Sequence, residues 1–259
     1  TILDELAKAA KLRVEKAKEV VSFDEIKEKA MALPKDNFTF EKALKKEDIA
    51  FICECKKASP SKGLIAVDFP YLQIAKDYEK AGADCISVLT EPTRFLGSDT
   101  YLKEIVMAVS TPCLRKDFTV DEYMIYEAKL LGAKAVLLIC SLLTKTELKK
   151  FMKICDDLGL SAMVETHDET EVKMALSVGA RVIGVNNRNL KDFSVDTENS
   201  VKMRSLIPKD LIFVSESGVK SASDIELLRQ IGADAVLVGE TLMRAGDKEK
   251  KLKELRGLL

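Results

Sequence analysis

The sequence predicts an α/β fold, a single (β/α)8 barrel with an N-terminal helical extension, on the basis of three observations. After residue 48, short apolar segments alternate with amphipathic segments eight times. The dipeptide Gly-Ala precedes every second apolar segment, and charged residues stand at the ends of several of them. The length of 259 residues suits one such barrel, because (β/α)8 barrels of about 250 residues commonly form one domain.

We expect one domain, residues 1–259, in which residues 1–48 form extra helices that cover one part of the barrel. From 2 to 20, apolar residues recur at spacings of three and four between charged residues, which is typical of an amphipathic helix. A second helix is predicted after Ser22, where Glu25 completes a capping box. A third, short helix fits the segment just before the first strand.

The predicted strands are short apolar segments, and segments of helical periodicity lie between them. The strands are predicted at 49–56, 83–89, 112–116, 134–140, 161–165, 181–186, 211–216 and 234–239. The helices are predicted near 69–81, 99–109, 121–131, 145–158, 168–178, 196–206 and 221–231, with one more after residue 240. Such alternation is typical of parallel sheets.

Four glycines mark a weak internal repeat. Glycine at the C-terminal cap of a helix allows the left-handed turn into the next strand. The Gly-Ala pairs begin at Gly82, Gly132, Gly179 and Gly232 and divide the barrel into four βαβα quarters. An open, doubly wound sheet uses similar caps and is the alternative fold, but its ligand groups gather at one switch point rather than around a ring.

Charge and composition exclude several classes of partner and site. The 41 Lys and Arg residues nearly balance the 42 Asp and Glu residues, so we expect no nucleic-acid partner and no membrane surface. We find neither a long apolar run nor a signal-peptide pattern and expect a soluble cytoplasmic protein, with a monomer as the working expectation. Six cysteines without paired spacing and a single histidine favour buried reduced thiols, so neither a metal nor a cofactor is expected.

The first predicted strand ends in two opposite charges. Side chains alternate along a strand, so Ile52, Glu54 and Lys56 share one face, whereas Cys53 and Cys55 point to the other. A partly buried Glu and Lys are costly unless they pair, and each shifts the pKa of the other. The pair is either part of a functional site or a structural ion pair.

Polar residues follow four other strands in the same way. Together with Glu54 and Lys56, the set consists of Lys116, Glu165, Asn186, Arg188, Glu216 and Ser217. Because catalytic groups of barrels lie at the carboxyl ends of the strands, we interpret this ring as a candidate active site, and it favours the closed barrel. Lys116 and Glu165 would place a proton donor beside an acceptor, as general acid–base catalysis requires. His167 is expected to be a loop residue near solvent.

Two glycine-containing loops predict a phosphate-binding site. Gly218 follows the seventh strand, and Gly239 follows the eighth, where Glu240 opens a helix. In this architecture the corresponding loops commonly hold phosphate through backbone N–H groups. Simple turn formation is the alternative explanation.

Four apolar residues near strand ends fit an apolar slot, although ordinary packing explains each of them equally well: Phe95, Phe118, Leu137 and Leu190.

Several motifs resemble those of the indole-3-glycerol-phosphate synthases of tryptophan biosynthesis. They are Glu54-Cys-Lys56-Lys-Ala-Ser59-Pro60-Ser, Lys116-Asp-Phe118, Val164-Glu165, Gly184-Val-Asn186-Asn-Arg188-Asn-Leu190 and Ser215-Glu216-Ser217-Gly218. The resemblance covers nearly the whole chain, including the N-terminal helices. It implies a TIM barrel carboxy-lyase that converts 1-(2-carboxyphenylamino)-1-deoxy-D-ribulose 5-phosphate to indole-3-glycerol phosphate by ring closure, decarboxylation and dehydration.

The resemblance also implies catalytic roles. Lys116 would be the general acid for ring closure, and Glu165 would stabilise cationic intermediates and serve as a base. Lys56, held by Glu54, would bind the substrate carboxylate and act as a second acid. Three further residues would complete the catalytic set: Asn186, Glu216 and Ser217.

Binding roles follow from the same resemblance. The phosphate would be held by Ser59, Gly218, Gly239 and the backbone amide of Glu240, with Arg188 balancing the charge. The anthranilate ring would be enclosed by Phe95, Phe118, Leu137 and Leu190.

The chain departs from the family pattern in a few places. Cys53 and Cys55 flank Glu54 where the family more often has alanine and an aliphatic or aromatic residue. Because both face the helices, we expect unaltered catalysis but a greater sensitivity to oxidation. Glu240 stands where some members have serine, and its carboxylate would repel phosphate unless it points away.

Two other functions remain open. A class I aldolase would use a strand-end lysine such as Lys116 to form a Schiff base with a ketone. The contexts of Glu165 and Asn186 favour the synthase instead. A non-catalytic barrel that binds a phosphate ligand would need only the two glycine loops, and the charged residues at the other strand ends argue against it.

Overall fold

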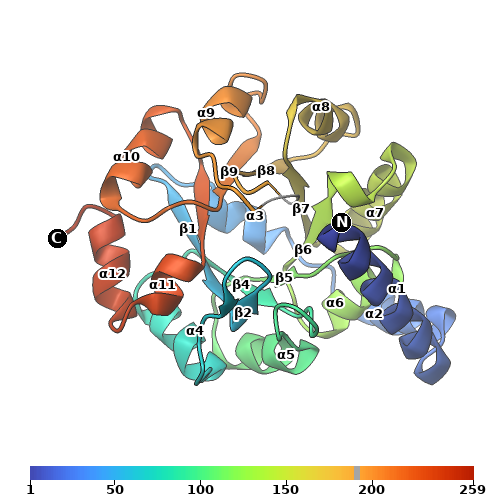
Figure 1. The fold of residues 1–259 in the computed structure, drawn as a ribbon. Coiled ribbons are helices and arrows are strands. Elements are labelled where there is room, and N and C mark those ends of the chain that lie inside the picture. The colour runs from blue at the N-terminus through green and yellow to red at the C-terminus, as the bar shows by residue number, and fades with distance from the viewer. Residues whose placement is uncertain (190–192) are drawn as a thin grey trace.

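Eight parallel strands close into a barrel surrounded by helices in the computed structural model, which describes residues 1–189 and 193–259 (Figure 1). The strands are β1 (Ala50–Cys55), β4 (Cys85–Leu89), β5 (Cys113–Lys116), β6 (Ala135–Ile139), β7 (Ser161–Thr166), β8 (Val182–Asn186), β9 (Ile212–Glu216) and β10 (Ala235–Val238). β1 pairs with both β4 and β10, so the sheet is closed and the doubly wound alternative is wrong. All eight strands were predicted to within two residues.

The outer helices also lie where the sequence places them, apart from the end of the chain. They are α4 (Tyr71–Lys80), α5 (Asp99–Ala108), α6 (Tyr123–Leu130), α7 (Lys145–Leu158), α8 (Glu169–Ser177), α9 (Glu198–Arg204), α10 (Ala222–Gln230), α11 (Glu240–Arg244) and α12 (Lys248–Leu255). One helix was expected after residue 240 and two are present. The chain becomes extended at Ala245, and the side chain of Asp247 then caps α12 by accepting from Lys250 N.

The four repeated glycines have the backbone conformation expected of helix caps. Gly82, Gly132, Gly179 and Gly232 have φ angles of 84°, 87°, 83° and 74°. Three short elements were not predicted, namely the hairpin β2 (Ala58–Ser59) with β3 (Gly63–Leu64) and the 3₁₀ helix η1 (Cys140–Leu142). The hairpin follows β1 and lies at the carboxyl ends of the barrel strands, which we call the mouth.

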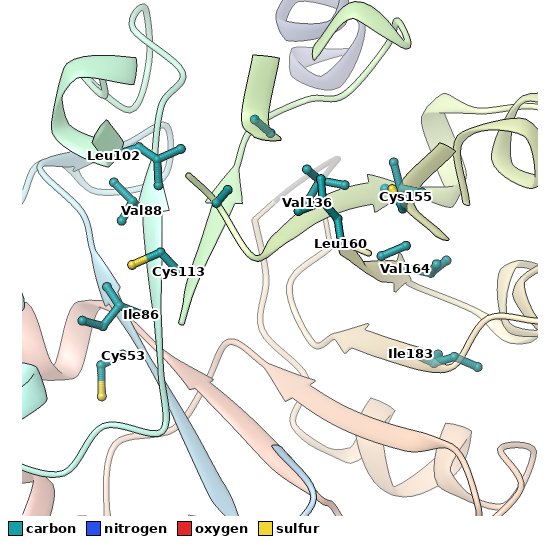
Figure 2. Close-up of a cluster of buried hydrophobic side chains, with 14 of the residues drawn as sticks. Cys53, Ile86, Val88, Leu102, Cys113, Val136, Cys155, Leu160, Val164 and Ile183 are labelled. Carbon is teal, nitrogen blue, oxygen red and sulfur yellow. The ribbon is translucent and has the colours of Figure 1, made fainter. Parts of the chain in front are cut away.

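Side chains of the strands alternate between two hydrophobic layers. Ile52 points into the barrel, whereas Cys53 and Cys55 pack in the layer between strands and helices. Figure 2 shows this outer layer, in which the strand residue Val88 lies near the helix residue Leu102. The predicted facing of β1 is confirmed. All six cysteines are free and buried, as expected.

The N-terminal extension reaches both ends of the barrel. It consists of α1 (Ile2–Val20), α2 (Phe23–Ala32) and α3 (Thr39–Leu44). The first turn of α1 lies at the mouth, where Ile2 and Leu3 line the main cavity. At the opposite end, Phe40 and Leu44 of α3 pack against the interior residues of the strands. The extension therefore contacts the barrel at both ends.

The capping box predicted for α2 is only half formed. Ser22 Oγ accepts from Glu25 N at 3.3 Å, as predicted. The Glu25 carboxylate, however, accepts from Lys29 Nζ at 2.6 Å. An (i, i+4) ion pair on the exposed face thus takes the carboxylate that would otherwise return to the cap.

The segment between α2 and α3 is attached to the C-terminus of α7. Gly159 caps α7 with a φ of 74° and a carbonyl that accepts from Phe38 N at 3.3 Å. Asp36 N donates to Leu158 O at 3.2 Å, and Lys129 Nζ donates to Leu158 O at 3.0 Å. Polar backbone groups thus join the extension to the barrel.

Within the described part of the chain, no helix has the length and apolar character needed to cross a membrane.

Candidate active site

A cavity of about 740 Å³ opens at the mouth of the barrel. The described residues that line it include every predicted site residue except Leu190, which lies outside the described residues. Those residues are Glu54, Lys56, Ser59, Phe95, Lys116, Phe118, Leu137, Glu165, Asn186, Arg188, Glu216, Ser217, Gly218, Gly239 and Glu240. The parallel strands bring together side chains that are up to 186 positions apart in the sequence, counting from 54 to 240.

Glu54 and Lys56 form a close ion pair on the interior face of β1. Lys56 Nζ lies 2.6 Å from Glu54 Oε1, and Ser87 Oγ donates to Glu54 Oε2 at 3.2 Å. Burial favours the protonated acid, but the ammonium groups of Lys56 and Lys116 outweigh it and hold the pKa of Glu54 below its ordinary value. A Cβ atom on Gly239 would lie 2.6 Å from Glu54 Oε1, so this glycine makes room for the pair.

Lys116 lies between two carboxylates. Its Nζ is 3.5 Å from Glu165 Oε2 and 3.5 Å from Glu216 Oε2. Burial lowers the pKa of Lys116, but the charges of Glu165, Glu216 and Glu54 outweigh that effect and raise the pKa above its ordinary value. Lys116 is therefore a protonated amine inside the cavity.

Glu165 and Glu216 share this lysine but have opposite pKa shifts. Burial raises the pKa of both, and in Glu165 the opposing effects of Lys116, His167 and Asn186 lower it to about 2. Asn186 Nδ2 donates to Glu165 Oε1 at 3.3 Å. Glu216 Oε1 has no hydrogen-bond partner among the described residues, and burial together with repulsion from Glu165 raises the pKa of Glu216 to about 8. The pKa of Glu216 thus lies well above that of Glu165, so Glu165 is the first of the two to lose its proton as the pH rises.

A Glu216→Gln variant is expected to gain stability relative to the parent protein as the pH rises from about 5 to 9. The folded state binds the Glu216 proton more tightly than the unfolded state, because the pKa rises from 4.5 to about 8 on folding. The stabilisation is complete below pH 4.5 and is lost as the pH passes through 8, whereas glutamine does not titrate. Urea unfolding of both proteins at pH 5, 7 and 9 measures the difference, and a difference independent of pH would contradict the assignment.

His167 lies in the loop between β7 and α8, as expected, but its side chain is turned toward the site. Its side chain is only 17% exposed, and its Nε2 lies 3.3 Å from Glu165 Oε1. Its Nδ1 lies 3.0 Å from Glu171 Oε2. Helix α8 begins two residues later, and its first turn brings Glu171 back over the imidazole ring. The four-residue spacing between His167 and Glu171 was the available signal.

Asn186 joins three of the predicted residues. While its amide nitrogen donates to Glu165, its Oδ1 accepts from Ser217 Oγ at 2.9 Å and from Arg188 N at 3.0 Å. Ser217 has a positive φ of 68°, which turns the chain sharply after β9. Arg188 donates from Nη1 to Phe193 O at 3.1 Å.

At the phosphate-binding end predicted for the cavity, the carboxylate of Glu240 is neutralised by two cations. Arg244 Nε lies 3.0 Å from Glu240 Oε1, and Lys62 Nζ of the β2–β3 hairpin lies 3.9 Å from the same oxygen. Sequence reasoning missed both cations, although the four-residue spacing between Glu240 and Arg244 is visible in the sequence. The backbone N–H of Glu240 starts α11 beside Gly239.

Apolar residues form the wall nearest α1. The rings of Phe95 and Phe118 have centroids 6.0 Å apart, and Leu137 lines the same cavity. Leu3 and Leu6 of α1 complete this wall. Sequence reasoning missed these two residues, because an amphipathic helix outside the barrel gives no indication of which end it covers.

A buried ion pair links α1 to the segment that carries Lys116. Arg13 donates to both oxygens of Asp117, at 2.7 and 3.0 Å, and Thr90 Oγ1 donates to Asp117 Oδ2 at 2.6 Å. Asp117 directly follows Lys116 and is fully buried in side chain. Helix α1 therefore contacts the segment that carries Lys116.

Comparison with known proteins decides the family. Residues 3–255 match the family model described as Indole-3-glycerol phosphate synthase. The chain belongs to the indole-3-glycerol phosphate synthase family. Its relatives include the indole-3-glycerol phosphate synthase of Ruminiclostridium cellulolyticum, which is 60% identical over 257 residues that cover 99% of each chain. That of Endomicrobium trichonymphae is 54% identical over 256 residues, which cover 98% of this chain and 99% of the relative.

Membership in the indole-3-glycerol phosphate synthase family makes the protein a carboxy-lyase of tryptophan biosynthesis. Solved structures at lower identity support the barrel fold alone. A 3-hexulose-6-phosphate synthase from Salmonella typhimurium has a TM-score of 0.67 at 14% identity and covers 82% of this chain and 98% of that chain. The tryptophan synthase complex from Pyrococcus furiosus has a TM-score of 0.61 at 16% identity, covering 81% and 98% respectively.

The two cysteines that flank Glu54 lie outside the cavity. Cys53 and Cys55 point away from the cavity, and both are at most 1% exposed. Burial raises the pKa of both thiols, so neither forms the reactive thiolate readily. Burial thus argues against the expected sensitivity to oxidation while the protein is folded, and that expectation stays a prediction.

Proposed function

We propose that this member of the indole-3-glycerol phosphate synthase family closes the indole ring with Lys116 as general acid and Glu165 as base. The observation that supports the proposal most strongly is the position of Lys116, an ammonium group held 3.5 Å from each of two carboxylates inside the cavity. The substrate is 1-(2-carboxyphenylamino)-1-deoxy-D-ribulose 5-phosphate, and the product is indole-3-glycerol phosphate.

Ring closure requires an acid at the ketone oxygen. The aromatic carbon that carries the substrate carboxylate attacks the ketone carbon, and the oxygen takes a proton from Lys116 to become a hydroxyl group. The attack leaves a positive charge on the ring nitrogen. The ionised Glu165, whose pKa is lowered to about 2, stabilises that charge across the cavity.

The later steps remove carbon dioxide and water. Carbon dioxide leaves from the ring carbon, and its bonding electrons return to the ring and cancel the positive charge. The hydroxyl group then leaves as water after protonation by a lysine, and the neighbouring CH₂ group gives a proton to Glu165. Lys56, 2.6 Å from Glu54, binds the substrate carboxylate and can serve as the second acid. Asn186, Glu216 and Ser217 complete the catalytic set.

The two ends of the cavity suit the two ends of this substrate. We assign the phosphate to Ser59, Gly218, Gly239 and the N–H of Glu240, with Arg188 balancing the charge. The anthranilate ring is assigned to Phe95, Phe118 and Leu137. Leu190 stays a proposed contact of this ring.

A Schiff-base aldolase is less well supported by this geometry. Attack on a ketone requires a neutral amine, whereas the carboxylates around Lys116 raise its pKa and favour the ammonium form. An acid suits this environment better than a nucleophile.

We further propose that residues 1–259 act as one domain, that the protein is a monomer and that it works in the cytoplasm. The packing of Phe40 and Leu44 against the barrel interior supports the first of these proposals.

The test is a fluorescence assay for indole-3-glycerol phosphate with the purified protein and the carboxyphenylamino-deoxyribulose phosphate substrate. Product formation is the expected result. Tight binding of the substrate without product would favour a non-catalytic phosphate-ligand barrel. A covalent adduct on Lys116 after borohydride treatment would instead favour the aldolase.

A further inference from the structure

A single imidazole links the catalytic carboxylate Glu165 to a second carboxylate outside the main cavity. His167 Nε2 lies 3.3 Å from Glu165 Oε1, and His167 Nδ1 lies 3.0 Å from Glu171 Oε2. Glu171 Oε2 also accepts from His167 N at 2.8 Å. The side chain of Glu171 on helix α8 therefore holds both the backbone N–H and the ring of His167. The mechanism described above assigns no function to His167.

The two oxygens of Glu165 have different partners. Oε1 faces His167 and Asn186, each at 3.3 Å. Oε2 faces Lys116 at 3.5 Å. Asn186 donates a hydrogen bond to Oε1, whereas His167 Nε2 makes an ion-pair contact with it and has no hydrogen-bond partner among the described residues. Both contacts hold Oε1 on the side away from Lys116, and Oε2 is left for the lysine and the substrate.

The charges around the ring favour the imidazolium form. The carboxylates of Glu165 and Glu171 contact the ring directly. The neighbouring cavity is also lined by the carboxylates of Asp168 and Asp196 and by the cation of Arg188. Ser141 Oγ, 3.4 Å from Nδ1, is the neutral polar contact from η1. Burial opposes protonation, but Glu165 and Glu171 outweigh it and raise the pKa of His167 to about 10.

We propose that His167 is a positioning residue for Glu165: held by Glu171, its imidazolium binds Glu165 Oε1 and directs Oε2 toward Lys116. The proposal rests on the proposed function, because the role assigned to Glu165 in ring closure is what makes its orientation matter. An imidazolium also keeps Glu165 ionised while Lys116 transfers its proton and loses its own charge. Without His167, that transfer would leave Glu165 with only the neutral amide of Asn186.

The first experiment is a proton NMR titration of the imidazole ring. The chain contains one histidine, so its ring signals need no assignment. In the parent protein the chemical shifts are expected to stay constant from pH 6 to 8 and to move only at higher pH. In Glu171→Gln and in Glu165→Gln the titration midpoint is expected to fall by at least about one unit, since each variant removes one charge next to the ring. The matched control is Glu169→Gln, which removes an exposed carboxylate of the same helix that pairs with Lys173.

The second experiment is steady-state kinetics of two variants across pH. His167→Leu is expected to lower kcat by about tenfold to a hundredfold with little change in KM, because Glu165 loses its ionic contact with the imidazolium. The acid limb of its kcat profile is expected to move to higher pH, because Glu165 is no longer held ionised by the imidazolium. His167→Gln, whose amide can still donate to Glu165, is expected to recover most of kcat. A purely structural role would not produce this recovery together with the shift of the acid limb.

Two results would overturn the positioning role. One is a parent titration midpoint near 6.5. The other is a His167→Leu variant with the kcat and pH profile of the parent in an otherwise active enzyme. Failure of the proposed function looks different, since the parent protein itself would then form no product.

Discussion

Replacing Lys116 with methionine is expected to lower kcat by several orders of magnitude. A general acid contributes about 10²–10⁴-fold, and loss of preorganised charge near the reacting atoms commonly adds about 10²–10³-fold. Substrate binding should fall much less, because the residues assigned to the phosphate belong to other segments, Gly218 after β9 and Gly239 after β10. Product fluorescence measures kcat, and a titration of the variant with the substrate measures substrate binding.

A matched control comes from the other end of the same barrel. Lys134 directly precedes β6 and pairs with Asp36 at 3.4 Å, so Lys134→Met also removes a lysine from an ion pair. Its kcat is expected to match that of the parent. Turnover by Lys116→Met within tenfold of the parent would remove Lys116 from the role of acid. Circular dichroism of both variants shows whether the fold is retained.

Replacing Gly159 with alanine is expected to lower the free energy of unfolding by about 2–5 kcal/mol, from left-handed strain and overpacking together. Gly159 has a φ of 74°, and a Cβ atom there would lie 1.8 Å from Asp36 O. Asp36 belongs to the segment that joins α2 to α3, so relief of the clash must move that segment away from α7. The midpoint of thermal unfolding is expected to fall by roughly 4–20 °C.

Gly179→Ala separates the two contributions. Gly179 has a φ of 83°, but a Cβ atom there meets nothing within 4 Å. This control therefore carries the backbone strain alone, about 1–2 kcal/mol. If both variants lose the same free energy of unfolding, the close approach of Gly159 to Asp36 O adds no cost of its own and this prediction is contradicted.

The fold could be predicted in detail because its signals are local. Each strand is a short apolar segment, and each Gly-Ala pair marks the end of a helix. The polar ends of the strands were equally visible, since Lys116 and Glu165 interrupt apolar runs. Parallel strands in one barrel place such residues at the same end, so the membership of the site followed from the topology.

Other features depend on contacts between distant segments, and the sequence pattern does not contain them. The pairing of Arg13 with Asp117 joins residues 104 positions apart. The environment of His167 depends on how the first turn of α8 packs beside Glu165. The β2–β3 hairpin has strands of only two residues each, too short for any periodicity.

The placement of the cysteines has a consequence for how the barrel opens. All six thiols are buried, and they occur in β1, β4, β5, η1 and α7, with none after residue 155. Five of the thiols lie in the layer between strands and helices and Cys85 lies in the barrel interior, so a thiol-reactive dye in native buffer reacts only when the first half of the barrel exposes one of these layers. Labelling at the rate of global unfolding would mean that the two halves open as one cooperative unit, and faster labelling would identify the first half as a separate, less protected unit.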